Sequence, residues 1–267
     1  MDDILQSSLG YEHLTVQRYS QGTFLGQQQD DVVQEIPVAL VYNEISHAVM
    51  MATPTHLEFF AKGFSLSEGI LQHLGELYAL DVVENELGVH VEMTISSRAF
   101  SALKMHRRAM IGPTGCGLCG IESLQQLHQD LKPVTTNFLS EWLKDIPNAV
   151  LHLNTQQKIT ALTGGAHAAA WVVKGEIIIL FEDVGRHNAL DKLLGYMAQH
   201  QLDVTTGFVL MTSRASYELV RKCTQLNIAL LACISAPTSL AIHMAKQSGL
   251  ALAAFCRGQG FVLYTPS

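Results

Sequence analysis

The chain has 267 residues, of which 48% are hydrophobic and 15% charged, so it can bury a large core and is not an intrinsically disordered protein. Its formal net charge is −7, with 17 Lys and Arg against 24 Asp and Glu and no basic run, so nucleic acid is not an expected partner. No apolar run approaches the ~20 residues that span a bilayer, and the start Met1-Asp2-Asp3 lacks the positive charge of a signal peptide. We therefore expect a cytoplasmic protein with no membrane partner.

The cysteine content indicates free thiols rather than a disulfide framework. The chain holds five cysteines, an odd number, and only Cys116 and Cys119 lie close together. A medium-sized chain with this pattern is typical of a reducing compartment. We expect two chemically active thiols and three structural ones.

The N-terminal part of the sequence predicts a β-rich domain. The first 30 residues hold few apolar positions and include the run Gln27–Gln29, so we expect a mobile arm there. Short segments rich in Val, Ile and Thr then predict strands over Ile36–Tyr42, His47–Met51, Leu77–Val83 and Gly88–Ile95. A helix is expected from Thr55 to about Ile70, with Thr55 as its cap and Glu58 completing a capping box.

A glycine-rich segment carries the two close cysteines. Residues 111–120 contain four glycines and one proline, so we expect a loop that presents Cys116 and Cys119 to another molecule. Two arginines just upstream, and a helix expected to begin near Ile121, would favour the thiolate form. Lowering a thiol pKa from ~8.5 to ~7 raises the thiolate share at neutral pH from a few per cent to about half. Such a thiol could accept sulfur from a persulfide.

Three other interpretations of this loop are weaker. A zinc site needs about four ligands, and no second close Cys or His pair supplies them at a familiar spacing. A thioredoxin-like redox pair sits on a strand-to-helix turn, which this glycine-flanked loop does not resemble. Gly115, Gly117 and Gly120 satisfy the spacing G-x-G-x-x-G, yet no clear strand precedes them and no βαβ unit follows. We therefore expect neither a metal site nor a dinucleotide site in this loop.

Beyond residue 160, strands and helices alternate in the sequence. Strands are expected over Glu176–Phe181, Gly207–Thr212, Ile228–Ile234, Leu250–Phe255 and Phe261–Tyr264. The helices expected between them are Asn188–His200, Ser216–Leu226 and Pro237–Gln247, the last with proline in its first turn. This alternation predicts a mostly parallel sheet, which would bind ligands beyond the carboxyl ends of its strands. Polar residues gather at those ends, at Glu182-Asp183, Ser213-Arg214, Ser235–Ser239 and Cys256-Arg257.

Two of the polar segments could contact a phosphate. The glycine pair in residues 163–165 has amides that could approach an anion, although an ordinary turn followed by a buried segment, with His167 in the core, explains it equally well. Arg186 and His187 belong to a segment, residues 182–192, that packs six ionisable side chains into eleven positions. Salt bridging explains part of this density, but Arg186 with His187 would also suit phosphate or carbonyl recognition.

A third polar segment and the remaining cysteines complete the candidates. Ser235–Ser239 places hydroxyls and amides where a helix is expected to begin, which favours an anion, and Ser235 could also simply cap that helix. Cys223 and Cys233 fall within a helix and a strand and are expected to be core thiols. Cys256 adjoins the polar strand ends, so its role stays open.

Several short strings in this chain occur in the same order in one known family. In the second half they are GCGLCG, TGGAHAAA, EDVGRHNALDK, SRASYE, SAPTSLA and FCRGQG. In the first half they are Glu35–Pro37, Asn43, Met51–Pro54, Phe60–Phe64 and Glu68–Ile70. From about residue 35 to its end, the chain therefore resembles the formate dehydrogenase accessory sulfurtransferases of the FdhD type.

The resemblance implies that a cysteine desulfurase donates sulfur to the paired cysteines as a persulfide. The sulfur then passes to the bis(guanine dinucleotide) molybdenum cofactor before that cofactor enters formate dehydrogenase. Cys116 matches the persulfide position, and Cys119 would be its relay or resolving partner. Phe255–Gly260 match the cofactor-binding segment, and a guanine nucleotide could share that pocket. The residues expected at the cofactor, from the resemblance or from the polar segments above, are Phe255, Cys256, Arg257, Gly258, Gln259, Gly260, Thr163, Gly164, Gly165, Arg186, Ser235, Thr238 and Ser239.

The resemblance also implies an α/β fold and a homodimer. The C-terminal domain would be cytidine-deaminase-like and the smaller N-terminal domain β-rich. The expected elements also change along the sequence, from mostly strands to alternating strands and helices. Together these observations predict a β-rich domain over 1–110, a cysteine loop with connecting helices over 111–150, and the deaminase-like domain over 151–267. A homodimer would suit a cofactor with two similar guanine ends.

Two other functions follow from the same features. A zinc deaminase needs H-x-E followed by P-C-x-x-C, but here Ala169 stands two residues after His167 and the paired cysteines come earlier in the chain. Deamination is therefore not expected. The alternative that stays open is a chaperone that binds the molybdenum cofactor and docks the desulfurase without itself carrying sulfur.

Overall fold

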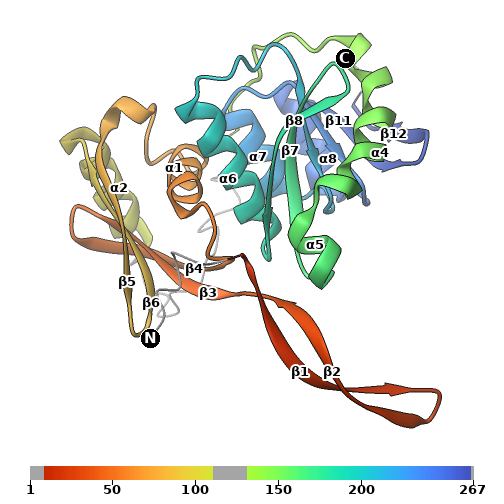
Figure 1. Cartoon of the computed structure of the whole chain (residues 1–267). Helices are drawn as coiled ribbons and strands as arrows, with labels where there is room; N and C mark the ends of the chain where they lie inside the picture. The colour runs from red at the N-terminus through yellow and green to blue at the C-terminus, as the bar shows by residue number, and fades with distance from the viewer. Residues whose placement is uncertain (1–8, 111–130, 266–267) are drawn as a thin grey trace.

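The described part of the chain folds into three β-sheets, two of which are packed against helices (Figure 1). This computed structural model describes residues 9–110 and 131–265, so Cys116 and Cys119 lie outside the described residues. The sheets have the strand orders β1-β2, β4-β3-β6-β5 and β12-β11-β10-β9-β7-β8. The division into domains at residues 110 and 150 stays a prediction.

The first sheet is a hairpin of β1 (Tyr11–Ser20) and β2 (Thr23–Val33). The expectation of a mobile arm is therefore wrong for residues 11–30. Gln21 and Gly22 both have positive φ, 49° and 86°, as a two-residue type I′ turn requires. Sequence reasoning missed the hairpin because both of its faces carry polar residues and Gln-Gly is a weaker turn signal than Asn-Gly.

The second sheet forms the N-terminal body together with two α-helices. Its elements are β3 (Ile36–Tyr42), β4 (Ile45–Ala52), α1 (Leu57–Ser67), η1 (Leu74–Glu76), β5 (Leu77–Asn85), β6 (Gly88–Ile95) and α2 (Ser97–Met110). β3 pairs in parallel with β6, and the other pairs are antiparallel. Alternate residues of β3, namely Val38, Leu40 and Tyr42, are buried with Phe60 and Phe64 of α1 because side chains alternate between the faces of a strand. The four strands predicted in this region are confirmed.

Helix α1 does not use the predicted cap. His56 is its N-cap residue, with φ of 55° and no side-chain hydrogen bond to the helix. The capping box of Thr55 and Glu58 is therefore wrong. The Thr55 hydroxyl instead accepts a hydrogen bond from Nζ of Lys192 at 3.2 Å. A contact with the C-terminal half of the chain thus overrides a local capping signal.

The third sheet is mixed rather than mostly parallel. In chain order, the strands of this sheet and the helices around it are η2 (Ser140–Asp145), α4 (Ile146–Gln156), α5 (Lys158–Thr163), β7 (His167–Val173), β8 (Glu176–Asp183), α6 (Arg186–Gln199), β9 (Phe208–Met211), α7 (Tyr217–Gln225), β10 (Leu230–Cys233), α8 (Ser239–Ser248), β11 (Ala251–Arg257) and β12 (Gly260–Leu263). β9, β10 and β11 are parallel, but β7 is antiparallel to β8 and β9, and β12 is antiparallel to β11. The expected parallel sheet is wrong because β7 was not recognised: its Ala168–Ala170 run lacks the β-branched residues typical of strands.

Helices pack on both faces of the six-stranded sheet. On one face, Leu193 of α6 and Leu219 of α7 share a core with Trp171 of β7. On the other face, Trp142 and Leu153 contribute to a second core with residues of β7, β9, β10 and β11. The α/β class with a β-rich N-terminal part is thus confirmed. Within the described ranges, no helix is both long and apolar enough to cross a membrane.

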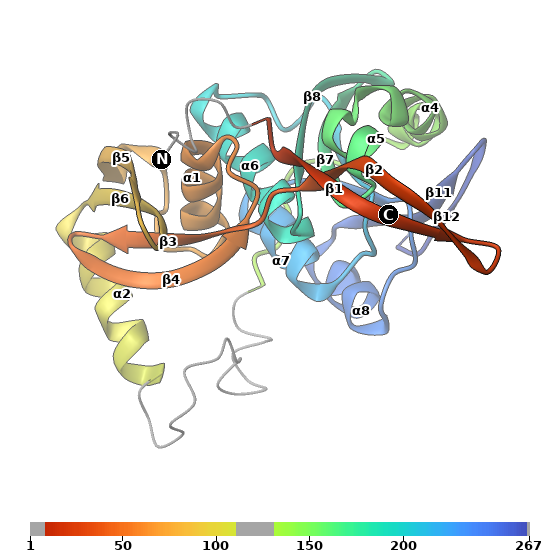
Figure 2. The same ribbon diagram turned by 60° about the horizontal axis from the view of Figure 1, so that its bottom comes forward.

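The N-terminal body joins the six-stranded sheet where α1 crosses α6 (Figure 2). Gly63 of α1 and Gly195 of α6 lie at this crossing. A Cβ atom built on Gly63 would lie 1.8 Å from the carbonyl oxygen of Asp191, and one on Gly195 would lie 1.9 Å from the carbonyl oxygen of Phe59. The two backbones therefore touch, and no larger residue fits at either position.

Replacing Gly195 by alanine is expected to lower the free energy of unfolding by about 2–3 kcal/mol, because the new methyl group meets backbone that cannot move aside. Chemical denaturation monitored by circular dichroism measures this change. The matched control is Gly75→Ala, whose methyl group would approach only the ring of the exposed His73, at 3.0 Å. That variant should change stability by less than about 0.5 kcal/mol. Equal losses in both variants would contradict a backbone contact at the crossing.

Candidate functional site

The polar segments predicted at the strand ends lie along one edge of the six-stranded sheet, which we call the rim. Because β9, β10 and β11 are parallel, their carboxyl ends bring Ser213, Ser235 and Arg257 to this edge. β7 runs in the opposite direction, so His167 at its start pairs with Asp183 at the end of β8 and lies on the same edge. The rim therefore gathers segments that are far apart in the sequence.

The loops after β9 and β10 are held together by backbone hydrogen bonds. The amide of Ala215 donates to Ala236 at 3.1 Å, and the amide of Thr238 donates back to Ala215 at 3.0 Å. The Thr238 hydroxyl accepts a hydrogen bond from the amide of Ala241 at 3.2 Å and so caps α8. The expected cap, Ser235, and the expected start of this helix at Pro237 are therefore wrong. Exposed Ser239 begins the helix.

Phe255 has an unusual backbone conformation for a large residue. Its φ is 53°, in the left-handed region, where a bulky side chain is strained. Its amide donates to the carbonyl of Ser235 at 3.2 Å, and the residue is 39% exposed. The guanidinium of Arg257 lies 6.0 Å from the ring centre, held by a hydrogen bond from its Nε to Ile234. The strained backbone thus presents an aromatic ring and a cation to solvent at the rim.

The side chain of Cys256 points the other way. The residue is completely buried and belongs to the core beneath the rim, so only its backbone could contact a ligand. Burial raises the pKa of its thiol to about 12. Cys223 and Cys233 are also completely buried, and burial raises their thiol pKa values further. The prediction that Cys223 and Cys233 are core thiols is confirmed.

The glycine turn before β7 has no free amide for an anion. Gly164 has φ of 64° and ends α5, and its amide donates to the carbonyl of Thr160 at 2.8 Å. The amide of Gly165 donates to the hydroxyl of Thr163 at 3.1 Å. Both amides are thus used within the turn that closes the helix, and a phosphate contact through them stays a prediction. An ordinary turn, the other interpretation, fits this segment.

Arg186 gives the rim a cationic end, with two histidines beside it. The Nε of Arg186 is buried and has no hydrogen-bond partner in the described part of the chain. His187 lies 3.7 Å from a carboxylate oxygen of Glu218, which is an ion-pair distance but too long for a hydrogen bond. Burial alone would raise the pKa of Glu218, but His187 and local hydrogen bonds hold it at about 2. His167 is half-buried, and burial together with Arg186 and His187 lowers its pKa. This end could therefore accept an anion.

Other members of the same charged segment support the fold. Lys192 is completely buried, and its Nζ lies 2.6 Å from Asp183 and donates to the carbonyl of Thr53 at 3.1 Å. Asp183 also accepts hydrogen bonds from the amides of Thr53 and Gly185 and from the side chain of Asn188. These contacts explain much of the charge density in residues 182–192 without a ligand.

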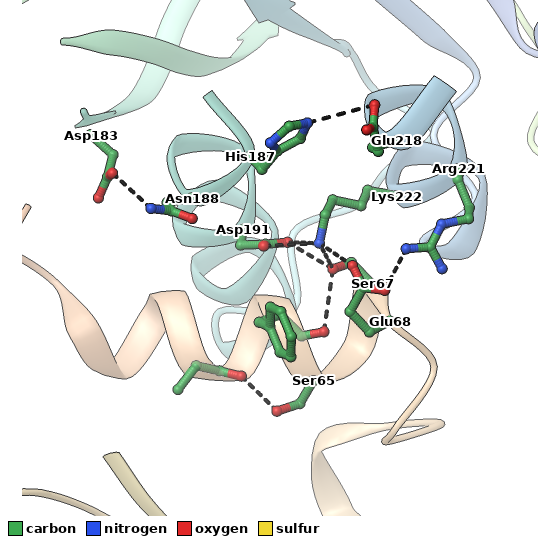
Figure 3. Close-up of polar contacts among 12 residues, drawn as sticks. Ser65, Ser67, Glu68, Asp183, His187, Asn188, Asp191, Glu218, Arg221 and Lys222 are labelled. Carbon is green, nitrogen blue, oxygen red and sulfur yellow. Dashed lines mark hydrogen bonds and ion pairs between the residues drawn. The ribbon is translucent and has the colours of Figure 1, made fainter. Parts of the chain in front are cut away.

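A second buried cluster centres on Lys222 of α7 (Figure 3). Its Nζ donates to the two carboxylate oxygens of Asp191 at 3.0 and 2.9 Å, to Ser67 at 2.9 Å and to Glu68 at 2.7 Å. Arg221 pairs with the same Glu68. Burial alone would lower the pKa of Lys222, but the two carboxylates raise it above its ordinary value. The cluster ties α1 to α6 and α7.

Comparisons with known proteins can now be set beside this geometry. The sequence pattern of the FdhD/NarQ family matches residues 33–267. The chain belongs to this family. The sulfur carrier protein FdhD of Acinetobacter baylyi is 62% identical over 236 residues, which are 88% of this chain and 86% of that protein. The protein of the same name from Chromobacterium violaceum is 48% identical over 268 residues, 99% of each chain.

A solved structure shares the whole architecture of this FdhD/NarQ chain. It is a proposed formate dehydrogenase accessory protein from Desulfotalea psychrophila, with a TM-score of 0.75 over 96% of this chain and 97% of that one. The sequence identity is 21%, so this likeness concerns the fold alone. It agrees with the mixed α/β arrangement described above.

The short sequence motifs shared with the FdhD/NarQ family predicted the rim, but they did not indicate the contacts of every side chain in or near it. Glu218 lies in SRASYE, yet nothing in the sequence indicated that it pairs with His187. Lys222, eight residues after Arg214, carried no signal at all because a lysine within a helix is usually exposed. Among the residues of 9–110 and 131–265, no three His, Cys, Asp or Glu side chains form a group that could hold a metal ion.

Glu68 makes the stability of this FdhD/NarQ chain depend on pH. Burial alone would raise its pKa, but Lys222 and Arg221 lower it to about 2. An unfolded glutamate titrates near pH ~4.3, so the ionised carboxylate stabilises the fold above that pH, and this contribution disappears as the pH falls towards 2. Glu68→Gln should therefore cost up to about 3 kcal/mol at pH 7 and almost nothing near pH 2.

The measurement is urea denaturation at several pH values. Glu58→Gln, at an exposed position of the same helix, is the matched control and should change the free energy of unfolding by less than about 0.5 kcal/mol. A loss in Glu68→Gln that is the same at pH 7 and pH 2.5 would mean that the ion pairs are not its cause.

Proposed function

We propose that this chain is a sulfur carrier required for formate dehydrogenase activity. It accepts sulfur from a cysteine desulfurase as a persulfide on Cys116, with Cys119 as relay or resolving partner. The sulfur passes to the bis(guanine dinucleotide) molybdenum cofactor before that cofactor is inserted into the enzyme. The observation that carries the proposal is the 62% identity, over 88% of this chain, to a protein named as a sulfur carrier.

The environment of the other cysteines supports Cys116 and Cys119 as the sulfur-carrying pair. Cys223, Cys233 and Cys256 are completely buried, and burial raises the pKa of each thiol. A buried thiol that stays protonated is a poor nucleophile. Of the five cysteines in the chain, only Cys116 and Cys119 remain as candidates.

The proposed chemistry is thiol exchange in two balanced steps. The Cys116 thiolate attacks the outer sulfur of the desulfurase persulfide, and the desulfurase cysteine leaves as a thiolate. The Cys119 thiolate then attacks the inner sulfur of the Cys116 persulfide, which releases the outer sulfur as sulfide to the cofactor and joins the two cysteines in a disulfide. The two thiolates supply the two electrons, and a thiol reductant of the cytoplasm restores them.

The rim is the proposed cofactor site. The exposed ring of Phe255 offers a face on which a guanine base can stack, with Arg257 beside it. Arg186, whose Nε lacks a partner among the described side chains, and the exposed hydroxyl of Ser239 suit phosphate oxygens. Gly258, Gln259 and Gly260 are exposed in the turn between β11 and β12. Thr163, Gly164 and Gly165 shape the nearby turn.

The remaining parts of the proposal concern fold and partners. The strand order β8-β7-β9-β10-β11, with β7 antiparallel and the next three strands parallel, supports the expected likeness to cytidine deaminases. We further propose that the chain acts in the cytoplasm as a homodimer. Its protein partners would be the desulfurase and formate dehydrogenase.

Intact-protein mass spectrometry tests the sulfur carrier. After incubation with a cysteine desulfurase and cysteine, the wild type should gain one or more sulfur atoms that a thiol reductant removes. Cys116→Ala should gain none, whereas Cys256→Ala, which alters a buried thiol, is the matched control and should gain as much as the wild type. No gain in any form, with an active desulfurase, would overturn the persulfide mechanism. Formate dehydrogenase maturation by a Cys116→Ala, Cys119→Ala double variant would favour the cofactor chaperone.

Titration with GDP, a probe for the guanine end of the cofactor, tests the rim. Phe255→Ala should raise the dissociation constant about tenfold because stacking of a base on an aromatic ring contributes ~1–3 kcal/mol. Phe255→Tyr should retain binding. Val262→Ala removes an exposed apolar side chain from the neighbouring strand and should bind as the wild type does. An unchanged affinity in Phe255→Ala would remove this ring from the proposed site.

A further inference from the structure

The four-stranded sheet has one face covered by helices and one face turned to solvent. Phe60 of α1 and Leu103 of α2 pack with Val38 and Val91 on the covered face. Because side chains alternate along a strand, the residues between these point to the other side, which we call the open face. A sheet with one solvent face normally carries polar side chains on that face. The open face should therefore be polar if it met only water.

The open face is instead apolar over two of its strands. It carries Pro37, Ala39 and Val41 of β3 and Val49 and Met51 of β4. Val49 pairs with Ala39 and Met51 with Pro37, so the two strands form one continuous patch. Val49 is 61% exposed and Met51 47%. Exposed apolar patches of this kind are typical of protein–protein contact sites.

Two carboxylates lie beside this apolar patch. Asp81 of β5 and Glu92 of β6 are exposed and stand directly opposite each other, and Glu92 also pairs with Val41 of β3. Like charges in such a position are unfavourable for the sheet. Within residues 9–110 and 131–265, neither carboxylate has a cationic partner. A cation of another molecule would relieve the repulsion, so the open face is complementary to a surface that combines apolar and basic side chains.

The charge of the open face selects the kind of partner. Membranes and nucleic acids present phosphate groups, which the two carboxylates would repel. A second copy of this chain would bring two acidic faces together, and each chain has a net charge of −7. A different protein with a basic surface fits best.

We propose that the open face docks the cysteine desulfurase, through a surface of that enzyme that carries Lys or Arg among apolar side chains. The inference rests on the proposed function, in which a desulfurase is the sulfur donor. α2 packs on this sheet and leads in the sequence directly to the segment with Cys116 and Cys119. β5 and β6 lie on the opposite side of the molecule from β11, which carries Phe255 of the rim (Figure 1, Figure 2). Donor and cofactor thus have separate surfaces.

Calorimetric titration of the full-length chain with a cysteine desulfurase tests the two carboxylates. The double variant Asp81→Lys, Glu92→Lys should raise the dissociation constant at least about tenfold, because repulsion replaces attraction. The matched control, Glu141→Lys, Glu176→Lys, makes the same change of net charge at two exposed carboxylates of the C-terminal half. Its dissociation constant should stay within about twofold of the wild-type value, since distant surface charges are screened by salt.

The single variant Asp81→Lys keeps the test valid if the double variant is damaged. It places a lysine opposite Glu92, so a repulsive cross-strand pair becomes an attractive one and the midpoint of thermal unfolding should not fall. Desulfurase binding should nevertheless weaken. A loss of fold cannot explain weaker binding in a variant that is at least as stable as the wild type.

The apolar patch is tested in the same titration. Val49→Ser, Met51→Ser should weaken binding of the desulfurase at least about tenfold. The matched control is Ile178→Ser, Val262→Ser, which removes two side chains that are 54% and 46% exposed on strands of the six-stranded sheet. It should bind the desulfurase as the wild type does.

Persulfide loading separates this inference from the proposed function. Inorganic polysulfide, a small donor that needs no docking, should load Asp81→Lys, Glu92→Lys as well as the wild type, whereas loading by the desulfurase should be slower. No loading of the wild type from either donor would count against the proposed function, and the titrations would still decide the docking. Wild-type affinity in both open-face double variants, a loss of affinity for formate dehydrogenase alone, or a change of molecular mass alone would each overturn docking of the desulfurase on this face.

Discussion

Buried ion pairs fix how the two halves of this molecule pack against each other. Lys192 has no exposed surface, and removing an ammonium group from water costs several kcal/mol unless its partners compensate. Asp183 and the Thr53 carbonyl provide that compensation, and Thr53 belongs to the segment that links β4 to α1. Because a lysine without these partners would be very unfavourable, the N-terminal sheet and the end of β8 have to meet at this place. The glycine contact between α1 and α6 lies close by and depends on the same arrangement.

The rim depends on this junction because one segment builds both. Within residues 182–192, Asp183, Asp191 and Lys192 face the interior, whereas Arg186 and His187 are half-exposed at the start of α6. The buried ion pair between Asp183 and Lys192 orients the first turn of α6. That turn then presents a cation with an unused Nε at the edge of the sheet. Fold and candidate site are therefore encoded by different residues of one short segment.

Many polar groups at the rim are already used by the protein itself. The glycine amides before β7 close α5, the Thr238 hydroxyl caps α8, and the loops after β9 and β10 bond to each other. These hydrogen bonds hold the loops of the edge in place, because the groups that make them have fixed partners. What remains for a ligand is a short set of outward-facing groups, with Phe255 held in a strained conformation that only the surrounding contacts maintain. An edge with these fixed loops and a few outward-facing groups agrees with the cofactor site proposed above.

The sequence by itself determined most strands and helices, the core role of Cys223 and Cys233, and the polar edge at the strand ends, because hydrophobic periodicity and turn residues act over short distances. It could not determine the cap of α1, the strand β7 or the polar hairpin, since each depends on partners distant in the chain: Lys192 for Thr55, two neighbouring strands for an alanine run, and the matching strand for β1. Nor could it show which charged side chains of residues 182–192 are buried in ion pairs and which are partly exposed at the rim. Only the tertiary structure decides which charges are buried together, because the cost of burying a charge depends on the partners that the fold brings within about 3 Å of it.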